Sequence, residues 1–413
     1  MNEEQEERED QVAKFQALLF VHSSLRKKKP TRRQAGRGRV KHDYERAKQC
    51  VLDDWPGPNA RYSDREFAAT YRVTKAIFQR ILDACLRHDG FFRSDRGKSS
   101  KIYPASKMLI ALQNWGYGIT PKAFKAYYQF SDATSHRSMN ATAKILNTAP
   151  EFAKYRSLPS VDMMREIVEV NKKRHGVEGM AGSLDCTHLS WQQCPNAWKG
   201  QFSGKGKKPT VVIEAVADHN LWIHHAWAGA PGNDNDVTIF NHSPLRRALV
   251  DGTFDKYDFA FEMGGEEFNQ VWMLVDGIYP ELSRFVKTVT EGWDDESRAF
   301  KEWQEGARKD IERAFGVLKK KFRFISSDIQ KLCFNDMVQS IKACVVLHNM
   351  MVEHRVNCKE EESDTFYYSD IPSAQGGGDA ALPTTRLTRL GPPWSDGGIF
   401  SLKLSSTGCG IAP

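Results

Sequence analysis

The stretch Met180-Ala-Gly-Ser-Leu-Asp185-Cys-Thr-His-Leu-Ser-Trp191 predicts a buried β-strand, because small and apolar residues fill most of it. A single carboxylate, Asp185, interrupts this run. A second apolar run, Val271-Trp-Met-Leu-Val275, ends directly at Asp276. Ligands of α/β sheets gather at the carboxyl ends of strands, and a carboxylate beside a core is costly unless it is paired or binds a cation. Both aspartates are therefore candidate metal ligands.

Further elements are expected around these two strands. The turn sequence Asp218-His-Asn220 joins two β-rich runs, 210–217 and 221–228, which indicates a hairpin. The pattern also predicts a strand at 285–289 and helices at 237–249, 299–322 and 337–352. Hairpin-like strands, a helix, a strand ending in an aspartate and a long helix together predict the α/β class, with an RNase H-like catalytic core made of a mixed sheet flanked by helices.

The sequence before this core, residues 61–175, is expected to be all-helical. Pro104 opens a helix that ends near Gly118, and Pro121 starts a short helix. Ser131 can cap a third helix that runs to about Asn147. Its polar residues are His136, Arg137, Asn140 and Lys144. This outline is typical of a helix-turn-helix domain that places its last helix in DNA, although a plain three-helix bundle gives the same pattern.

Glu312 is the third informative carboxylate. It lies in the middle of the predicted helix 299–322, beside the apolar stripe. Three converging carboxylates suit Mg²⁺ or Mn²⁺, and two such ions, roughly 3.5–4 Å apart, would serve cleavage of a phosphodiester. Gly316, one turn later, leaves room for a phosphate backbone, which Arg308 and Lys319 on that face can neutralise. Asp310 is expected to face solvent.

Positive charge is concentrated in one segment. The chain has 59 Lys and Arg against 52 Asp and Glu, a net charge of +7, and removal of the nine basic residues between Arg26 and Lys41 leaves −2. The residues predicted there to bind nucleic acid are Arg26, Lys27, Lys28, Lys29, Arg32, Arg33, Arg37 and Arg39. Phosphate binding or nuclear import explains such a cluster, and a solubilising tail is the alternative. A second basic loop offers Lys205, Lys207 and Lys208.

Composition sets the expected boundaries and excludes several classes of protein. We expect a disordered arm at 1–60, a helical DNA-binding domain at 61–175, the nuclease domain at 176–355 and a disordered tail at 356–413. No apolar run approaches the roughly 18 residues that span a bilayer, and the acidic first residues differ from a secretory signal. The eight cysteines include no Cys-x-x-Cys pair, which favours reduced thiols in the cytosol or nucleus.

A zinc site and other kinds of catalytic or nucleotide-binding site have weaker support in the sequence. A zinc site would need a set drawn from Cys186, His188, Cys194, His219, His224 and His225. Their spacing matches no established zinc template, so buried cysteines and strand histidines explain these residues better. The sequence has no Gly-x-Ser-x-Gly elbow, P-loop or dinucleotide fingerprint.

Several strings resemble the conserved blocks of PIF/Harbinger-type DDE transposases, especially the form widespread in plant genomes. The first-aspartate block is matched by the stretch around Asp185 followed by Cys194-Pro-Asn-Ala-Trp-Lys-Gly200. The other matching strings are Glu214-Ala-Val-Ala217, Leu221-Trp-Ile-His-His-Ala226, Pro231-Gly-Asn-Asp-Asn-Asp236-Val237, Leu274-Val-Asp-Gly-Ile-Tyr-Pro280, Arg308-Lys-Asp-Ile-Glu-Arg-Ala-Phe-Gly-Val-Leu318 and Leu347-His-Asn-Met-Met351. The resemblance covers about residues 60–355. The stretch 291–300 departs from it.

The resemblance implies that Asp185, Asp276 and Glu312 form the catalytic, metal-binding triad, with two Mg²⁺ or Mn²⁺ ions as cofactors. Asp236 occupies a further acidic position, where it either assists metal binding or caps the following helix. The implied activity is cut-and-paste transposition in the nucleus: a homo-oligomer on DNA cleaves terminal inverted repeats and transfers the strands into a short A·T-rich target. The implied partner is a Myb-like accessory protein, and no membrane is involved. The rival reading is a domesticated descendant that binds DNA or the Myb-like partner without cutting.

Overall fold

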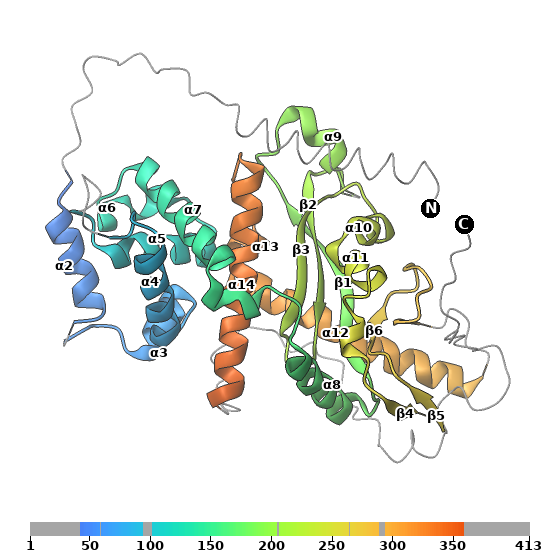
Figure 1. The fold of residues 1–413 in the computed structure, drawn as a ribbon. Helices are drawn as coiled ribbons and strands as arrows, with labels where there is room; N and C mark the ends of the chain where they lie inside the picture. Colours follow the sequence, from blue (N-terminus) through green and yellow to red (C-terminus); the bar gives the residue numbers. More distant parts are fainter. Residues whose placement is uncertain are drawn as a thin grey trace.

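The computed structural model describes residues 42–57, 59–93, 101–204, 206–263, 265–288 and 294–358. A group of helices and a sheet-containing part lie on either side of helix α14 (Phe334–Cys358) (Figure 1). The predicted basic arm, Lys205 and residues 359–413 of the predicted tail lie outside the described residues.

A five-stranded mixed sheet forms the centre of the second part. Its strands are β1 (Met180–Ser190), β2 (Thr210–Ala217), β3 (Ile223–Pro231), β6 (Trp272–Val275) and β7 (Phe285–Lys287). They lie in the order β3-β2-β1-β6-β7. The three strands β1, β2 and β3 pair antiparallel, whereas β6 is parallel to both β1 and β7. The predicted α/β class with a mixed sheet flanked by helices is therefore confirmed.

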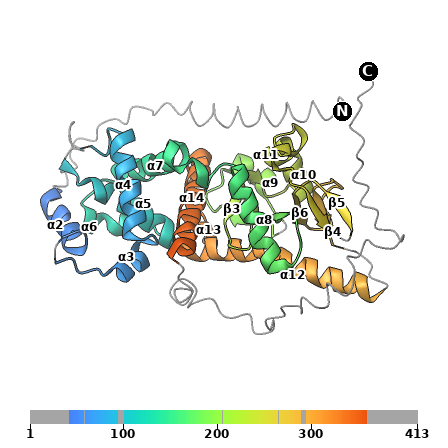
Figure 2. The ribbon, with the colours of Figure 1, turned by 60° about the horizontal axis from the view of Figure 1, so that its bottom comes forward.

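Helices cover both faces of this sheet (Figure 2). On one face, α8 (Val161–His175), α10 (Asp236–His242) and α11 (Pro244–Val250) bury apolar side chains against β1, β2 and β6. On the other face lie α12 (Asp295–Lys321), the short α13 (Arg323–Ser326) and α14. Two buried clusters thus sandwich the sheet, as the layer rule for α/β domains requires.

Capping side chains, prolines and a glycine set several ends of the N-terminal helices. They are α3 (Asp64–Tyr71), α4 (Lys75–His88), α5 (Pro104–Tyr117), η2 (Pro121–Phe124), α6 (Lys125–Tyr128), α7 (Asp132–Thr148) and η3 (Pro150–Tyr155). Ser63 and Glu66 form a reciprocal capping box at α3. Ser131 caps α7 as predicted, and α5 ends at Gly118, whose φ of 66° suits glycine.

Three details of the predicted elements were wrong. Helix α2 (Tyr44–Asp54) lies inside the segment expected to be disordered, where Tyr127 donates hydrogen bonds to Asp54 and to the Cys50 carbonyl. The predicted helix 237–249 is two helices, because Pro244 lacks an N–H and Ser243 caps a new helix there. The hairpin of β4 (Phe261–Met263) and β5 (Glu266–Phe268) was not expected, because its strands are too short to show a period.

Helix α7 packs against α14 rather than standing apart. The Asn140 and Asn147 side-chain amides donate hydrogen bonds to Asp336 and Gln339 of α14. The largest core cluster runs from Val51 to Val352 and includes residues of α4, α5, β2, α12 and α14. Helices and sheet therefore share one core. Of the four polar α7 residues named above as candidates for DNA contact, His136, Arg137 and Lys144 remain exposed.

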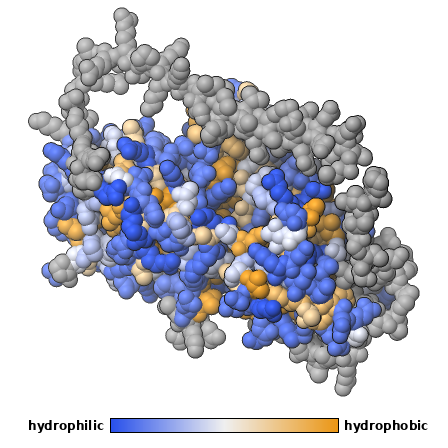
Figure 3. Space-filling model, in the orientation of Figure 1, coloured by the Kyte–Doolittle hydropathy of each residue, from blue (hydrophilic) through white to orange (hydrophobic). Residues whose placement is uncertain are grey.

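The face shown in Figure 3 is mostly hydrophilic, with apolar side chains in small separate groups. None of the helices in the described ranges combines the length and apolar character needed to cross a membrane.

Asn349 of α14 is fully buried and ties three backbone groups together. Its Oδ1 accepts from the Ile223 N–H at 2.9 Å, and its Nδ2 donates to the carbonyls of Ile223 and Tyr155 at 2.7 and 3.0 Å. Asn349→Ala leaves these groups unpaired, so we expect the free energy of unfolding to fall by roughly 2–4 kcal/mol. Urea unfolding measures this. Asn335→Ala, at an exposed position of the same helix, should change it by less than about 0.5 kcal/mol. Equal losses for the two variants would contradict the prediction.

Candidate metal centre

The sheet register brings Asp185 and Asp276 to the same level. Strands β1 and β6 are parallel neighbours, and Ser183 pairs with Leu274. Asp185 and Asp276 each follow two positions later, so each points to the same face of the sheet as the paired residue before it. Leu274 packs with Ala307 of α12 on that face. Both aspartates therefore face α12, one in the middle of β1 and one just beyond the end of β6.

The backbone N–H of the residue after each aspartate holds its carboxylate in place. Asp185 Oδ1 accepts from the Cys186 N–H at 2.8 Å, and Asp276 Oδ1 accepts from the Gly277 N–H at 2.7 Å. Each side chain therefore keeps its other oxygen for a further partner.

Helix α12 supplies the third carboxylate and a cation. Arg308 Nη1 lies 3.2 Å from Asp185 Oδ2, and its Nη2 lies 3.4 Å from Glu312 Oε1, one turn along α12. The Asp185 and Arg308 side chains are each 20% exposed, whereas that of Glu312 is 52% exposed. One guanidinium thus joins a carboxylate of the sheet to a carboxylate of the helix.

Asp236 occupies the first turn of α10. The residue that caps this helix is Asn235, whose side chain accepts from the Thr238 N–H at 2.8 Å. Of the two roles expected for Asp236, capping is therefore wrong. The negative charge of Asp236 raises the pKa of Asp185, which places both carboxylates in one electrostatic environment.

Burial raises the pKa of Asp185 to about 6. The Cys186 N–H and the Arg308 charge oppose this rise, whereas the charges of Asp236 and Glu312 add to it. The carboxylates around Asp185 consequently repel one another when all are ionised, and a cation among them would relieve that repulsion.

The donor set fits hard divalent ions. Carboxylate oxygens are the ligands that Mg²⁺ and Mn²⁺ prefer. The ligand oxygens of Asp185, Asp276 and Glu312 do not all lie within 4.8 Å of one another. Such spacing excludes a tight site for one ion. A pair of ions roughly 3.5–4 Å apart does not require all three carboxylates to bind one ion.

Helix α12 offers a lysine and open space near this centre, and two further lysines are exposed before β2. Lys319 of α12 is half-buried and donates to Thr187 Oγ1 of β1 at 2.5 Å. Lys207 and Lys208 are exposed in the loop before β2. A Cβ added at Gly316 would meet nothing within 4 Å. The space over Gly316 is therefore free for an approaching ligand.

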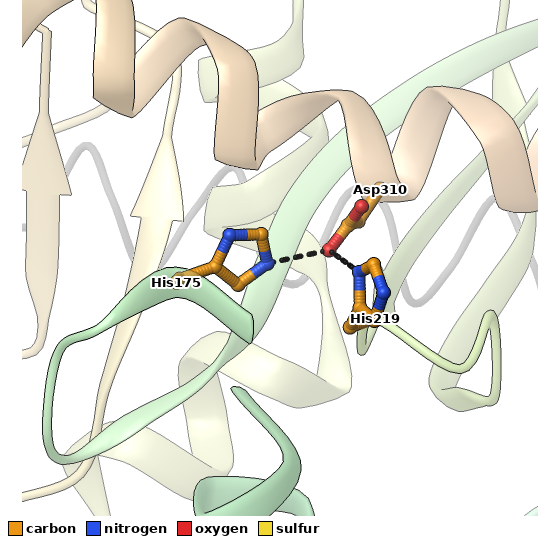
Figure 4. Close-up of side chains that lie close together, drawn as sticks. All are labelled: His175, His219 and Asp310. Atoms are coloured by element: carbon orange, nitrogen blue, oxygen red, sulfur yellow. Dashed lines mark hydrogen bonds and ion pairs between the residues drawn. The ribbon is translucent and has the colours of Figure 1, made fainter. Parts of the chain in front are cut away.

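Asp310 does not face solvent, so that expectation was wrong. It is 4% exposed, and its Oδ2 lies 2.8 Å from His175 Nε2 and 3.1 Å from His219 Nδ1 (Figure 4). Its Oδ1 accepts from Arg313 at 2.7 Å. Burial raises the pKa of Asp310, but the hydrogen bonds from both histidines and the Arg313 charge outweigh it and hold that pKa below its usual range.

Sequence reasoning missed this cluster because its members come from three distant segments. His175 ends α8, His219 lies in the β2–β3 turn and Asp310 lies in the middle of α12. No spacing template joins them. The available signal was the position of Asp310 two residues before Glu312, which directs it to the opposite side of the helix.

The residues considered for a zinc site have separate partners, apart from His219. His188 pairs with Thr210, His224 with the Ala181 carbonyl, His225 with Glu214 and Cys186 with Tyr279. Among the described residues, His175, His219 and Asp310 are the group of three whose ligand atoms all lie within 4.8 Å of one another.

The family model for plant transposon proteins matches residues 153–359, half of the chain. The chain belongs to the plant transposon protein family. The match runs from η3 to the end of α14 and contains Asp185, Asp236, Asp276 and Glu312, so membership indicates a transposon-derived protein with a transposase-related function. No curated protein and no solved structure matches the chain.

The raised pKa of Asp185 makes stability depend on pH. In EDTA, the folded protein binds this proton more tightly than the unfolded chain between pH about 4 and 6. The free energy of unfolding therefore falls as pH rises through that window, by up to about 3 kcal/mol. Asp185→Asn removes this contribution. We expect the variant to match wild type at pH 4 and to exceed it in stability at pH 8, as measured by chemical unfolding. A constant difference between the two proteins across this range would contradict the prediction.

Proposed function

We propose that this chain is a PIF/Harbinger-type DDE transposase, a metal-dependent DNA endonuclease and strand transferase. One observation carries the proposal: Asp185 in β1 and Asp276 just beyond the end of the parallel neighbour β6 follow a paired register position by two residues each, and Glu312 projects from the helix that crosses the same face. All three residues lie within the part of the chain that matches the family.

The strand arrangement supports an RNase H-like core for this enzyme. Three antiparallel strands are followed in the sheet by two parallel strands, and the long helix α12 packs across β1 and β6. Along the chain, three strands, helices α10 and α11, the strand before Asp276 and the long helix α12 also follow one another in the order from which we expected that core. The helix-turn-helix role of α7 stays a prediction, with His136, Arg137 and Lys144 as the side chains available to DNA.

Asp185, Asp276 and Glu312 would hold two Mg²⁺ or Mn²⁺ ions, with Asp236 as a further acidic neighbour. When bound, such ions activate a water or a 3′-hydroxyl and stabilise the leaving oxygen of a phosphodiester. Arg308 pairs with Asp185 and Glu312, offsets part of their negative charge and links the two side chains. Asp185 must be ionised to bind a cation, so its raised pKa makes metal binding weaken in acid.

Several basic groups would hold the DNA. Lys319 lies beside Thr187 of β1, Lys207 and Lys208 are exposed in the loop before β2, and the basic arm and Lys205, outside the described residues, add positive charge that attracts phosphates. We further propose nuclear action on inverted-repeat DNA as a homo-oligomer with a Myb-like accessory protein. These proposals come from the family resemblance and from the charge of the arm.

The rival function is DNA or partner binding without cleavage. The contacts of Arg308 favour it, because the guanidinium already pairs with two of the three carboxylates and offsets part of their negative charge without a metal ion. A cleavage assay separates the two functions.

Wild-type protein should nick inverted-repeat DNA in Mg²⁺ or Mn²⁺ and lose that activity in EDTA. Asp276→Asn and Glu312→Gln each remove a ligand charge, so we expect cleavage to fall roughly 100-fold or more while DNA binding persists. Glu302→Gln is the matched control, an exposed carboxylate of the same helix, and should cleave like wild type. If wild type nicks no faster than Asp276→Asn, the nuclease proposal fails and the binding function stands.

Gly316→Leu tests whether DNA passes over α12. A Cβ at Gly316 meets nothing within 4 Å, and the same holds for Gly306 in the same helix. Leucine is a better helix former than glycine by up to about 1 kcal/mol, so neither substitution should lower the unfolding temperature. We expect Gly316→Leu to cut cleavage at least tenfold and Gly306→Leu to leave it unchanged. Equal cleavage by both variants would show that the backbone of DNA does not approach Gly316.

A further inference from the structure

His175, His219 and Asp310 bring two nitrogens and one oxygen together at the junction of α8, the β2–β3 turn and α12. The side chains are 11%, 23% and 5% exposed, respectively. Asp310 Oδ2 lies 2.8 and 3.1 Å from the two nitrogens, and all three atoms lie within 4.8 Å of one another. We propose that this cluster is a binding site for a zinc-class transition-metal ion. This proposal does not rest on the proposed function.

The spacing of the three atoms is close to that of a metal site. Zinc binds nitrogen and oxygen at about 2.0–2.1 Å, so neighbouring ligands of a tetrahedral ion lie about 3.3 Å apart. The two contacts of Asp310 would lengthen by only a few tenths of an ångström to admit an ion.

His219 Nδ1 faces both Asp310 Oδ2, at 3.1 Å, and Arg313 Nη2, at 3.2 Å. The two hydrogens of Arg313 Nη2 have other acceptors in Asp310 Oδ1, at 2.7 Å, and the His219 carbonyl, at 3.4 Å, so Nδ1 can donate its proton to Asp310. An ion between His219 and Asp310 would replace that proton, and Arg313 would keep its contact with Asp310 Oδ1.

The surrounding contacts hold the ligands as the outer shell of a metal site does. The fully buried Asn171 accepts from the backbone N–H of His219 at 3.2 Å. The Trp303 indole donates to the His175 carbonyl at 3.0 Å. Arg313 fixes the Asp310 oxygen that would not bind the ion. Such outer contacts orient ligands and raise metal affinity.

The donor set selects the class of ion. Imidazole nitrogens suit zinc and its neighbours, whereas the carboxylate centre around Asp185 suits Mg²⁺ or Mn²⁺. The two sites lie on different sides of α12, because Asp310 and Glu312 are two positions apart and project about 200° from each other. Three protein ligands leave a fourth position, on the side where His219 and Arg313 reach solvent.

An ion here would clamp α12 to α8 and to the β2–β3 turn. The clamp lies two residues from Glu312, so it would fix the segment of α12 that carries that side chain. Its expected role is structural, with a gain in stability that follows from binding the folded state alone.

Cobalt(II) provides the test, because a four-coordinate site gives it intense visible absorption. The full chain carrying Asp276→Asn, to weaken the carboxylate centre, is stripped with chelator and titrated with Co²⁺. We expect one visible-absorbing ion per chain, no sulfur-to-cobalt charge-transfer band, displacement by Zn²⁺, and a rise of several degrees in unfolding temperature at saturating Zn²⁺.

His219→Ala in the same background should weaken Co²⁺ binding at least about 100-fold and abolish the thermal shift. His219 lies in a turn and is partly exposed, so this variant is expected to fold, and circular dichroism checks it. His136→Ala, at an exposed histidine of α7, should bind like its parent. The proposal is overturned if the parent protein binds no Co²⁺, if the spectrum shows cysteine ligation, or if His219→Ala binds equally well. In those cases the cluster is a hydrogen-bonded His–Asp–His network only.

Discussion

The packing of α12 across β1 and β6 is the constraint on which the rest of the structure depends. Ile311, Ala314, Phe315 and Leu318 are buried toward the sheet side and α14, and this fixes the rotation of the helix about its own axis. Once that rotation is fixed, Arg308 reaches Asp185 and pairs with Glu312, and Asp310 points the other way, toward His175 and His219. Apolar burial thereby positions two polar clusters at once, on different sides of one helix.

The two clusters differ in their electrostatics, because the pKa of Asp185 is raised whereas that of Asp310 is lowered. Burial and the neighbouring carboxylates raise the pKa of Asp185, and the positive charge of Arg308 only partly offsets this rise. Asp310 is buried as well, but two histidines and Arg313 surround it and keep it ionised. The first arrangement has an excess of negative charge that favours hard divalent ions, whereas the second has imidazole donors that favour softer ones. The chemical difference between the two sites therefore lies in the neighbours that each carboxylate meets.

Helix α14 links the sheet to the N-terminal helices. Asn349 ties α14 to β3 and η3, and Asn140 and Asn147 of α7 reach its other side. The sequence indicated an apolar helix here, but not that it would be covered on both sides. Hydrophobic periodicity reports that a face is buried and does not identify the partner that covers it. For the same reason the local pattern predicted a helix-turn-helix outline or a plain three-helix bundle, and did not show that α7 would pack against α14.

The sequence by itself determined the elements and the carboxylates of one site. Strands at Asp185 and Asp276, the hairpin between them and the long helix at Glu312 follow from local patterns, because short-range sterics and burial leave a strong periodic signal. Only the tertiary structure decided that Asn235 rather than Asp236 caps α10, that Arg308 bridges two of the acids, and that Asp310 meets His175 and His219. These contacts join segments tens of residues apart or more, or depend on which side of a helix is covered. The spacing of residues along the chain reveals neither the long-range contacts nor the covered side of a helix.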